Sequence, residues 1–263
     1  MQRRGMFAAT AVLFVIIVVG ESLGGVAVHA QTVSYVGVLY DSPKFAEVVP
    51  GAGWAAVILS DPLDGSYASE YKTFVANMHS NGVVAAGTLY RPTMSQVTSA
   101  ALKTASFGFD MIILDELISP GIADAKNFNK LYAQVKAKYP KVQLGLSDYD
   151  EIKMQAILSK GARPDFIALT CYQALATSQY KIDVLASLSA KYKVPAYAWI
   201  NIADPAYPQT TDQELMKTVA VYAKSKLNGV WFWEYGDITW SGWTWGDWYL
   251  KNYPYVKLLV STL

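Results

Sequence analysis

The chain contains eight short apolar runs whose starts lie 20 to 35 residues apart, with helix-like segments between them. Each run is almost continuously hydrophobic, which is typical of a parallel strand covered on both faces. Between the runs, apolar residues recur at helical spacing, as at Tyr71, Phe74, Val75 and Met78. The predicted strands are Ser34–Tyr40, Trp54–Ser60, Val83–Tyr90, Phe109–Asp115, Val142–Ser147, Asp165–Cys171, Val194–Ile200 and Gly229–Tyr235.

Eight strand–helix units in about 230 residues predict an α/β fold, a (β/α)₈ TIM barrel, formed as a single domain over residues 31–263. A doubly wound open sheet is the alternative, but no glycine-rich turn follows the first strand, which disfavours it. The first crossover, residues 41–53, is too short for a long helix. We expect a final helix around Gly246–Leu259, interrupted by Pro254.

Residues 1–30 have the features of a secretory signal peptide. Arg3 and Arg4 precede the apolar run Met6–Val19, and Val28–Ala30 offers small residues for cleavage. An uncleaved membrane anchor is the competing interpretation, because the apolar stretch approaches the length of a membrane span. Glu21 and three nearby glycines argue against it. We therefore expect a secreted, extracellular protein, with a membrane anchor facing outside as the alternative.

The charge balance and the single cysteine exclude several classes of function. Removal of residues 1–30 takes away two arginines and one glutamate, so that 20 basic and 20 acidic side chains remain. Without a basic cluster the sequence predicts no nucleic-acid partner. Cys171 is the only cysteine, so no disulfide can form within the chain, and its apolar neighbours indicate a buried strand residue, not a nucleophile.

Histidines are too few for the common histidine-based mechanisms. The chain has His29, in the predicted signal peptide, and His79, at the end of a predicted helix that precedes a strand. In a barrel that end lies opposite the active site, so a Ser–His–Asp triad and a histidine-bound zinc are disfavoured. The sequence also lacks a P-loop and a dinucleotide fingerprint. We expect no cofactor and no metal, and any catalysis must use carboxylates.

The strand Phe109–Asp115 ends in two adjacent acids, Asp115 and Glu116. A carboxylate at the end of a buried strand is expensive to desolvate, which favours a functional role. The alternative is a helix N-cap, for which one aspartate would suffice. Strand alternation points the two side chains in opposite directions unless the strand breaks at Asp115. Glycoside hydrolysis needs two such groups, and the second could be Glu116, Asp148 or Glu234.

Acidic and aromatic residues gather at the predicted C-terminal strand ends, where barrel enzymes carry their active sites. Rings beside carboxylates and amides suit a sugar, because rings cover the apolar faces of pyranoses. For Trp231 core packing is the better interpretation, and four tryptophans in Trp240–Trp248 could form a sugar-stacking rim or pack on the final helix. The candidate substrate-binding residues are Tyr40, Asp61, Tyr90, Arg91, Tyr172, Trp199, Asn201 and Trp233.

Three segments give the first half of the chain a family resemblance: Val57–Pro62, Gly82–Arg91 and Phe109–Glu116. They resemble the spherulin-4-like, endo-polygalactosaminidase-type glycosidases, in which an apolar strand ends in Asn-Pro and a later strand reads Asp-Gly-Ile-Phe-Phe-Asp-Glu. Here Asp61 replaces the asparagine. The resemblance covers about residues 34–120 and implies a TIM-barrel enzyme that hydrolyses galactosamine-containing polysaccharide internally. Asp115 and Glu116 match its acidic pair.

The later strands bear a weaker resemblance to family 18 chitinases, through Asp165–Tyr172 and Gly229–Tyr235. The chitinase motif Asp-x-x-Asp-x-Asp-x-Glu is not met, because Ile113 and Leu117 occupy acidic positions of that motif. This departure keeps a degenerate, non-catalytic barrel open as the alternative.

The sequence as a whole predicts a secreted glycoside hydrolase that cleaves a polysaccharide or oligosaccharide. An acidic, aromatic site suits neutral or amine-bearing sugars better than uronic acids. The rival is a non-catalytic carbohydrate-binding or cell-surface barrel. We expect a monomer, with no membrane contact once the N-terminus is removed.

Overall fold

The computed structural model describes most of the unit Thr32–Leu263. The described residues are 35–40, 51–59, 63, 67–90, 94–121, 123–172, 174–201, 213–235, 239–240, 243–244, 258–260 and 263. Side chains are described for all of these except residues 35–40, 90, 94–95, 201, 233–235, 239–240 and 243–244. The predicted signal peptide and most of the expected final helix lie outside this part of the chain.

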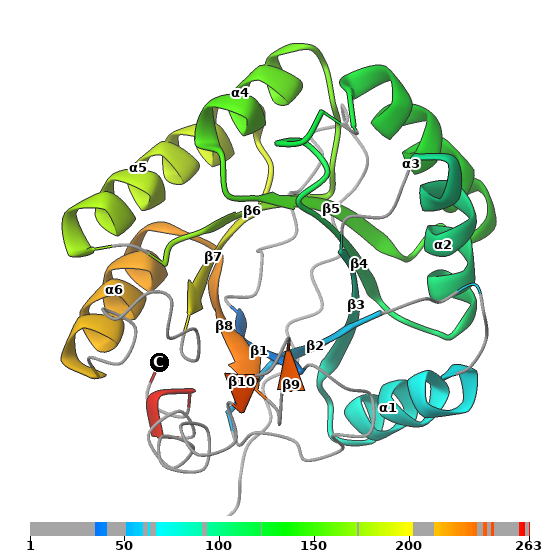
Figure 1. Cartoon of the computed structure of the whole chain (residues 1–263), viewed down its shortest axis with the longest axis horizontal. Helices are drawn as coiled ribbons and strands as arrows, with labels where there is room; N and C mark the ends of the chain where they lie inside the picture. The colour runs from blue at the N-terminus through cyan, green and yellow to red at the C-terminus, as the bar shows by residue number, and fades with distance from the viewer. Residues whose placement is uncertain are drawn as a thin grey trace, which may run out of the picture. The chain divides into compact units, whose positions relative to one another are not determined.

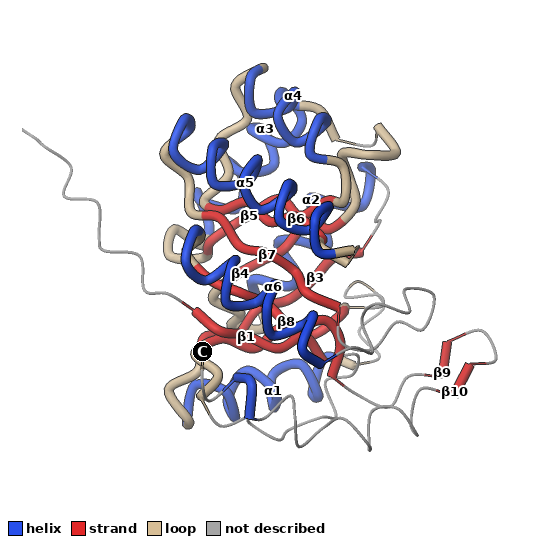
Figure 2. Tube along the Cα trace, turned by 90° about the vertical axis from the view of Figure 1, so that its left-hand side faces the viewer, coloured by secondary structure: helices blue, strands red, loops and turns tan. Residues whose placement is uncertain are grey.

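Eight parallel strands close into a barrel in sequence order, and helices surround it (Figures 1 and 2). Residues of β1 pair with those of β8 as well as β2, which closes the ring. The fold confirms the predicted (β/α)₈ barrel. The strands are β1 Tyr35–Tyr40, β2 Trp54–Ile58, β3 Val84–Tyr90, β4 Met111–Asp115, β5 Gln143–Asp148, β6 Phe166–Thr170, β7 Ala196–Asn201 and β8 Gly229–Tyr235.

The helices follow the strands as the hydrophobic pattern requires. In α1 the residues Tyr71, Phe74, Val75 and Met78 are all buried, as their spacing predicts. None of the described helices is both long and apolar enough to cross a membrane. The helices are α1 Ala68–Ser80, α2 Met94–Ser106, α3 Ala125–Lys138, α4 Glu151–Ser159, α5 Leu175–Tyr192 and α6 Gln213–Lys226.

Several helix ends follow from local chemistry. Asp124 and Asp150 are the N-caps of α3 and α4, and each carboxylate accepts a hydrogen bond from the backbone N–H three residues later. Helix α5 ends at Lys193, which takes the left-handed conformation with φ 54°. A short antiparallel hairpin, β9 Thr239–Trp240 with β10 Trp243–Thr244, was not expected from the sequence.

Strand alternation divides the core into an inner and an outer layer. The outer layer, which includes Ile112, Leu114, Leu144 and Leu146, packs with the helices. The inner cluster fills the barrel and consists of Trp54, Ala56, Ala86, Met111, Ile113, Phe166, Ala168, Tyr197, Trp199 and Trp231.

Stacked aromatic rings occupy the barrel interior. The ring of Trp231 lies between those of Trp54 and Tyr197, with a centroid separation of 4.3 Å in each pair and nearly parallel planes. Phe166 meets Trp231 edge to face at 5.8 Å. Gly145 faces Phe166, whose ring occupies the space that a Cβ at position 145 would need. The barrel is therefore a packed core and not a pore, as is usual for this fold.

Candidate functional site

Asp115 faces the barrel interior at the C-terminal end of β4. Met111 and Ile113, two and four residues earlier, both belong to the inner cluster, so the two-residue period of the strand turns Asp115 the same way. The residue is 6% exposed, in a strand whose other residues are all buried and apolar. The structure thus fixes the parity that the sequence left open, with Asp115 inward.

A relay of two hydrogen bonds holds this carboxylate. The hydroxyl of Ser147 on β5 donates to Oδ1 of Asp115 over 2.6 Å. The indole Nε1–H of Trp199 on β7 donates to Ser147 Oγ over 3.0 Å. Ser147 pairs with Asp115 in the register of β4 and β5, which brings the two side chains to the same level. The sequence placed Ser147 at the end of a predicted strand, but we did not include it among the candidate site residues.

Strand β4 breaks directly after Asp115. Glu116 has φ 51°, in the left-handed region that a non-glycine residue rarely occupies and that costs about 1–2 kcal/mol. Its backbone N–H still donates to the carbonyl of Ser147 over 2.9 Å, so the strained conformation is held by the sheet. Glu116 is half-buried. This break is the condition under which both acids could reach the same end of the barrel, and strain of this kind clusters at functional sites.

Asp148 does not point into the barrel, as a catalytic acid at this end would have to. It shares the outward face of β5 with Leu144 and Leu146, and its side chain is fully buried. Its two carboxylate oxygens accept from four backbone N–H groups and one hydroxyl, donated by Ile118, Ser119, Tyr149 and Asp150. The expectation that Asp148 lines the site therefore needs correction, because its carboxylate fixes the loops after β4 and β5.

Trp199 also departs from its expected place. It is 2% exposed and lies edge to face against Trp54 at 5.7 Å and Trp231 at 4.7 Å. A ring enclosed in this way has no open face for a sugar, so its contribution to the site is the hydrogen bond to Ser147. Trp231 is fully buried, as predicted. Tyr172, just after β6, is half-buried and packs against the inner cluster.

Several candidate residues lie outside the described side chains. Tyr90 pairs with Asp115 in the register of β3 and β4, and Asn201 pairs with Trp233 in that of β7 and β8. Their backbones are therefore at the C-terminal ends of the strands, as predicted. The same holds for Tyr40 on β1 and Glu234 on β8. Asp61, Arg91 and most of Trp240–Trp248 fall outside the described residues.

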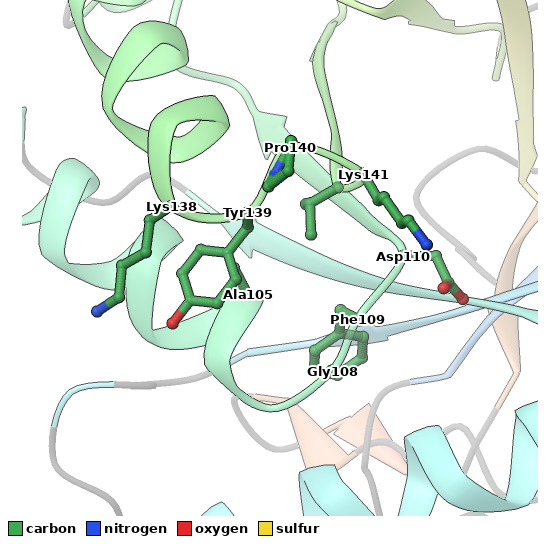
Figure 3. Close-up of a pocket in the computed structure, with 9 residues that line it drawn as sticks. Ala105, Gly108, Phe109, Asp110, Lys138, Tyr139, Pro140 and Lys141 are labelled. Carbon is green, nitrogen blue, oxygen red and sulfur yellow. The ribbon is translucent and has the colours of Figure 1, made fainter.

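The opposite end of the barrel holds His79 and a shallow pocket. His79 Nε2 lies 2.8 Å from Oδ2 of Asp110, which also accepts from the backbone N–H of Ala85 over 2.9 Å. These contacts link the end of α1 to the starts of β3 and β4, so the predicted position of His79 is confirmed. The pocket of about 370 Å³ lies beside them (Figure 3) and is lined by Ala105, Gly108, Phe109, Asp110, Lys138, Tyr139, Pro140, Lys141 and Val142.

Neither a thiol nucleophile nor a metal cluster is found among the described side chains. Cys171 is buried, and its burial raises the pKa of the thiol to about 12, which leaves it protonated and unreactive near neutral pH. Within the described part of the chain no three His, Cys, Asp or Glu side chains gather as a metal site would require.

Comparisons with known proteins support the fold. No family model matches the chain, and no curated protein matches it. Among solved structures, the chain is similar to the GH113 β-mannanase AaManA from Alicyclobacillus acidocaldarius, with a TM-score of 0.57 and 9% identity over 88% of this chain and 98% of that one. An endoglucanase gives a TM-score of 0.56 and 10% identity over 89% and 98%.

Barrels with other chemistry are also similar. The HpcH/HpaI aldolase from Desulfitobacterium hafniense has a TM-score of 0.51 and 11% identity, covering 86% of this chain and 92% of its own. At such low identities these likenesses establish the (β/α)₈ fold and leave the activity to be argued from the site.

Proposed function

We propose that this chain is a glycoside hydrolase that cleaves a polysaccharide by carboxylate chemistry. The observation that carries the proposal is Asp115, a buried carboxylate that faces the interior at the C-terminal end of a barrel strand and is held by Ser147. Barrel enzymes place their reactive groups at this end. Two solved glycosidases with the same fold are consistent with it.

The second acid in this proposal is Glu116. A glycosidase needs one carboxyl group to protonate the leaving oxygen and another to stabilise or attack the anomeric carbon, or to activate water. Glu116 is the next residue in the chain, and the left-handed turn frees it from the outward direction that an unbroken strand would impose. The strain stored at this position supports a functional role. Glu234 on β8 remains the other candidate for this group.

The proposed substrate is a polysaccharide of neutral or amine-bearing sugars. The resemblance of Val57–Pro62, Gly82–Arg91 and Phe109–Glu116 to endo-polygalactosaminidase-type enzymes supports galactosamine-containing chains. A buried aspartate beside a glutamate also favours an amine-bearing sugar over a uronic acid by charge complementarity. The aromatic residues Tyr90, Tyr172 and Trp233 at the same strand ends are the proposed sugar contacts.

The test is turnover on a polysaccharide panel that contains galactosamine, chitosan, mannan and glucan polymers, with mass analysis of the products. The variants are Asp115→Asn and Glu116→Gln, which keep the side-chain shape and remove the acid. Asp183→Asn is the matched control, because Asp183 is exposed on α5 and contacts Tyr222 and Lys226 of α6. Oligosaccharide products from wild type and Asp183→Asn, with none from Asp115→Asn, would support the proposal.

Binding without turnover in the wild-type protein would favour the non-catalytic carbohydrate-binding barrel. Cleavage of a carbon–carbon bond in a small acid, with no action on any polymer, would favour aldolase chemistry. Either result would refute the proposed hydrolase.

We further propose that residues 1–30 direct export and are then removed. The support is the Arg3–Arg4 pair, the apolar run Met6–Val19 and the small residues before Gln31. The intact mass of the protein recovered from the culture medium tests this proposal, with a chain beginning at Gln31 expected. Recovery of the full-length chain in the membrane fraction would support the anchor instead.

A further inference from the structure

Two hydrogen bonds meet at Ser147, and the chemistry of the indole fixes the direction of one of them. An indole N–H can only donate, so Ser147 Oγ accepts from Trp199 Nε1 at 3.0 Å. A serine hydroxyl has one proton, and the second contact of this oxygen is Asp115 Oδ1 at 2.6 Å. The structure directs this proton to Oδ1, where it stabilises the ionised form of the carboxylate more than the neutral form.

The relay is rigid as well as directional. Ser147 is fully buried, and the indole of Trp199 is enclosed by Trp54 and Trp231. Neither donor can turn away without disturbing the packed interior of the barrel. The donors are therefore in place before any substrate arrives. Donors fixed in this way offset the free-energy cost of removing a charged group from water.

We propose that Ser147 and Trp199 are positioning residues that keep Asp115 ionised and fixed in direction, so that Asp115 acts as the charged partner and another group supplies the proton. This inference rests on the proposed hydrolase function. It separates the roles of the two acids, which the sequence could not do. In glycoside hydrolysis the charged partner faces the anomeric carbon or the attacking water, while the proton goes to the leaving oxygen.

The neighbouring titratable groups come from the elements beside Asp115. Glu116 follows it in the chain, and Tyr172 approaches the inner cluster from the end of β6. Tyr90 is its register partner on β3. Asp148, next to Ser147 on β5, faces outward, and its oxygens are engaged by the loops after β4 and β5. The relay contributes stabilisation to the ionised form of Asp115, because the hydroxyl of Ser147 donates to its Oδ1.

The experiment compares Ser147→Ala and Trp199→Phe with two matched controls. Thr88→Val removes a buried hydroxyl, and Trp231→Phe removes a buried indole N–H, and neither of these atoms has a hydrogen-bond partner among the described residues. Thr88→Val loses the same group as Ser147→Ala, and Thr88 takes part in neither hydrogen bond of the relay. Trp231→Phe leaves the indole N–H of Trp199 in place, so it measures how repacking of the ring beside Trp199 affects the site. Melting temperatures for all four separate packing losses from effects on the site.

Two readouts are made on each protein. The first is the pH dependence of kcat/KM on the best polysaccharide. The second is the titration of the Asp115 carboxyl by ¹³C NMR, with the signal assigned from Asp115→Asn. Loss of a hydrogen bond to the charged form makes that form less favourable, so Ser147→Ala should move the acid limb and the titration upward by about one pH unit. The kcat of Ser147→Ala should fall about tenfold, with a smaller change in KM.

Trp199→Phe should move both readouts in the same direction by less. Thr88→Val should leave them unchanged, and Trp231→Phe should move them less than Trp199→Phe does. An Asp115 signal that is protonated at neutral pH in the wild type would overturn the inference. So would unmoved readouts in Ser147→Ala. If Asp115→Asn retains full turnover, the proposed function fails instead, and the NMR titration still decides whether the relay holds the charge.

Discussion

The carboxylate of Asp148 accepts a hydrogen bond of 2.9 Å from the backbone N–H of Ser119, although the two residues lie 29 positions apart. Asp148 ends β5, and Ser119 belongs to the loop that follows Asp115 and Glu116. A second backbone N–H of that loop, from Ile118, donates to the same oxygen over 3.0 Å. The outward face of β5 thus anchors the loop after β4, while Ser147 on its inward face holds Asp115.

Asp148→Asn should lower the free energy of unfolding by about 2–3 kcal/mol. An amide offers one acceptor oxygen where the carboxylate offers two, so buried backbone donors of Ile118, Ser119 or Tyr149 lose their partner. Urea unfolding measures the change. Asp150→Asn is the control, because asparagine caps a helix about as well as aspartate, and it should cost about 0.5 kcal/mol or less.

Equal stability of the two variants would contradict this structural role. If Asp148→Asn kept full stability and lost turnover, Asp148 would return as a candidate acid.

Glu116→Gly should leave stability unchanged or raise it by up to about 1 kcal/mol, because glycine adopts φ 51° without strain. Turnover should fall at least tenfold with the loss of the carboxyl group. Lys193→Gly is the matched control. Lys193 is the other described non-glycine residue with positive φ, at the end of α5, and its replacement should stabilise the protein and leave turnover as it was.

Thermal melts and rates of the two glycine variants check this prediction. Marked destabilisation by Glu116→Gly alone would mean that the glutamate side chain supports the fold, and a wild-type rate in that variant would remove Glu116 from the mechanism.

Stability should fall as the pH rises from about 9 to 12. Burial raises the pKa of Cys171 from its ordinary 9.0 to about 12. Burial and the hydrogen bond to Asp165 raise that of Tyr132 from 10.0 to about 12. The unfolded chain therefore loses these protons first, so their contribution is complete below pH 9 and is lost as the pH approaches 12.

Urea midpoints measured across this range test the pH prediction. Cys171→Ala combined with Tyr132→Phe should flatten the decline. A decline as steep in the double variant as in the wild type would assign the alkaline sensitivity to other groups.

The fold was predictable from the sequence because its signals are local. Each apolar run became a barrel strand, with ends shifted by at most two residues, since burial on both faces requires continuous hydrophobicity. Asp115 could be named as a candidate because an acid at the end of such a run is unusual. The inward direction of Asp115 could not be predicted, because it depends on which alternate residues fill the barrel.

The rest of the site depends on relationships between strands. Ser147 reaches Asp115 through the register of β4 and β5, and Trp199 lies two strands further along, on β7. No local pattern encodes these pairings. The same reasoning explains the misplacement of Asp148 and Trp199. Their positions at strand ends are correct, but the outward face of β5 and the crowded interior of the barrel decide what their side chains contact.

The role of Asp115 is tested most directly by the rate of polysaccharide cleavage by Asp115→Asn relative to wild type, on a substrate that the wild-type protein cleaves. Asparagine keeps the shape and can still accept from Ser147, so the melting temperature should change little. Removal of the Asp115 carboxyl should lower kcat/KM by about 10²–10⁴-fold, the range typical of removing an acid or base group. A folded Asp115→Asn protein that cleaves the substrate at the wild-type rate would contradict this role.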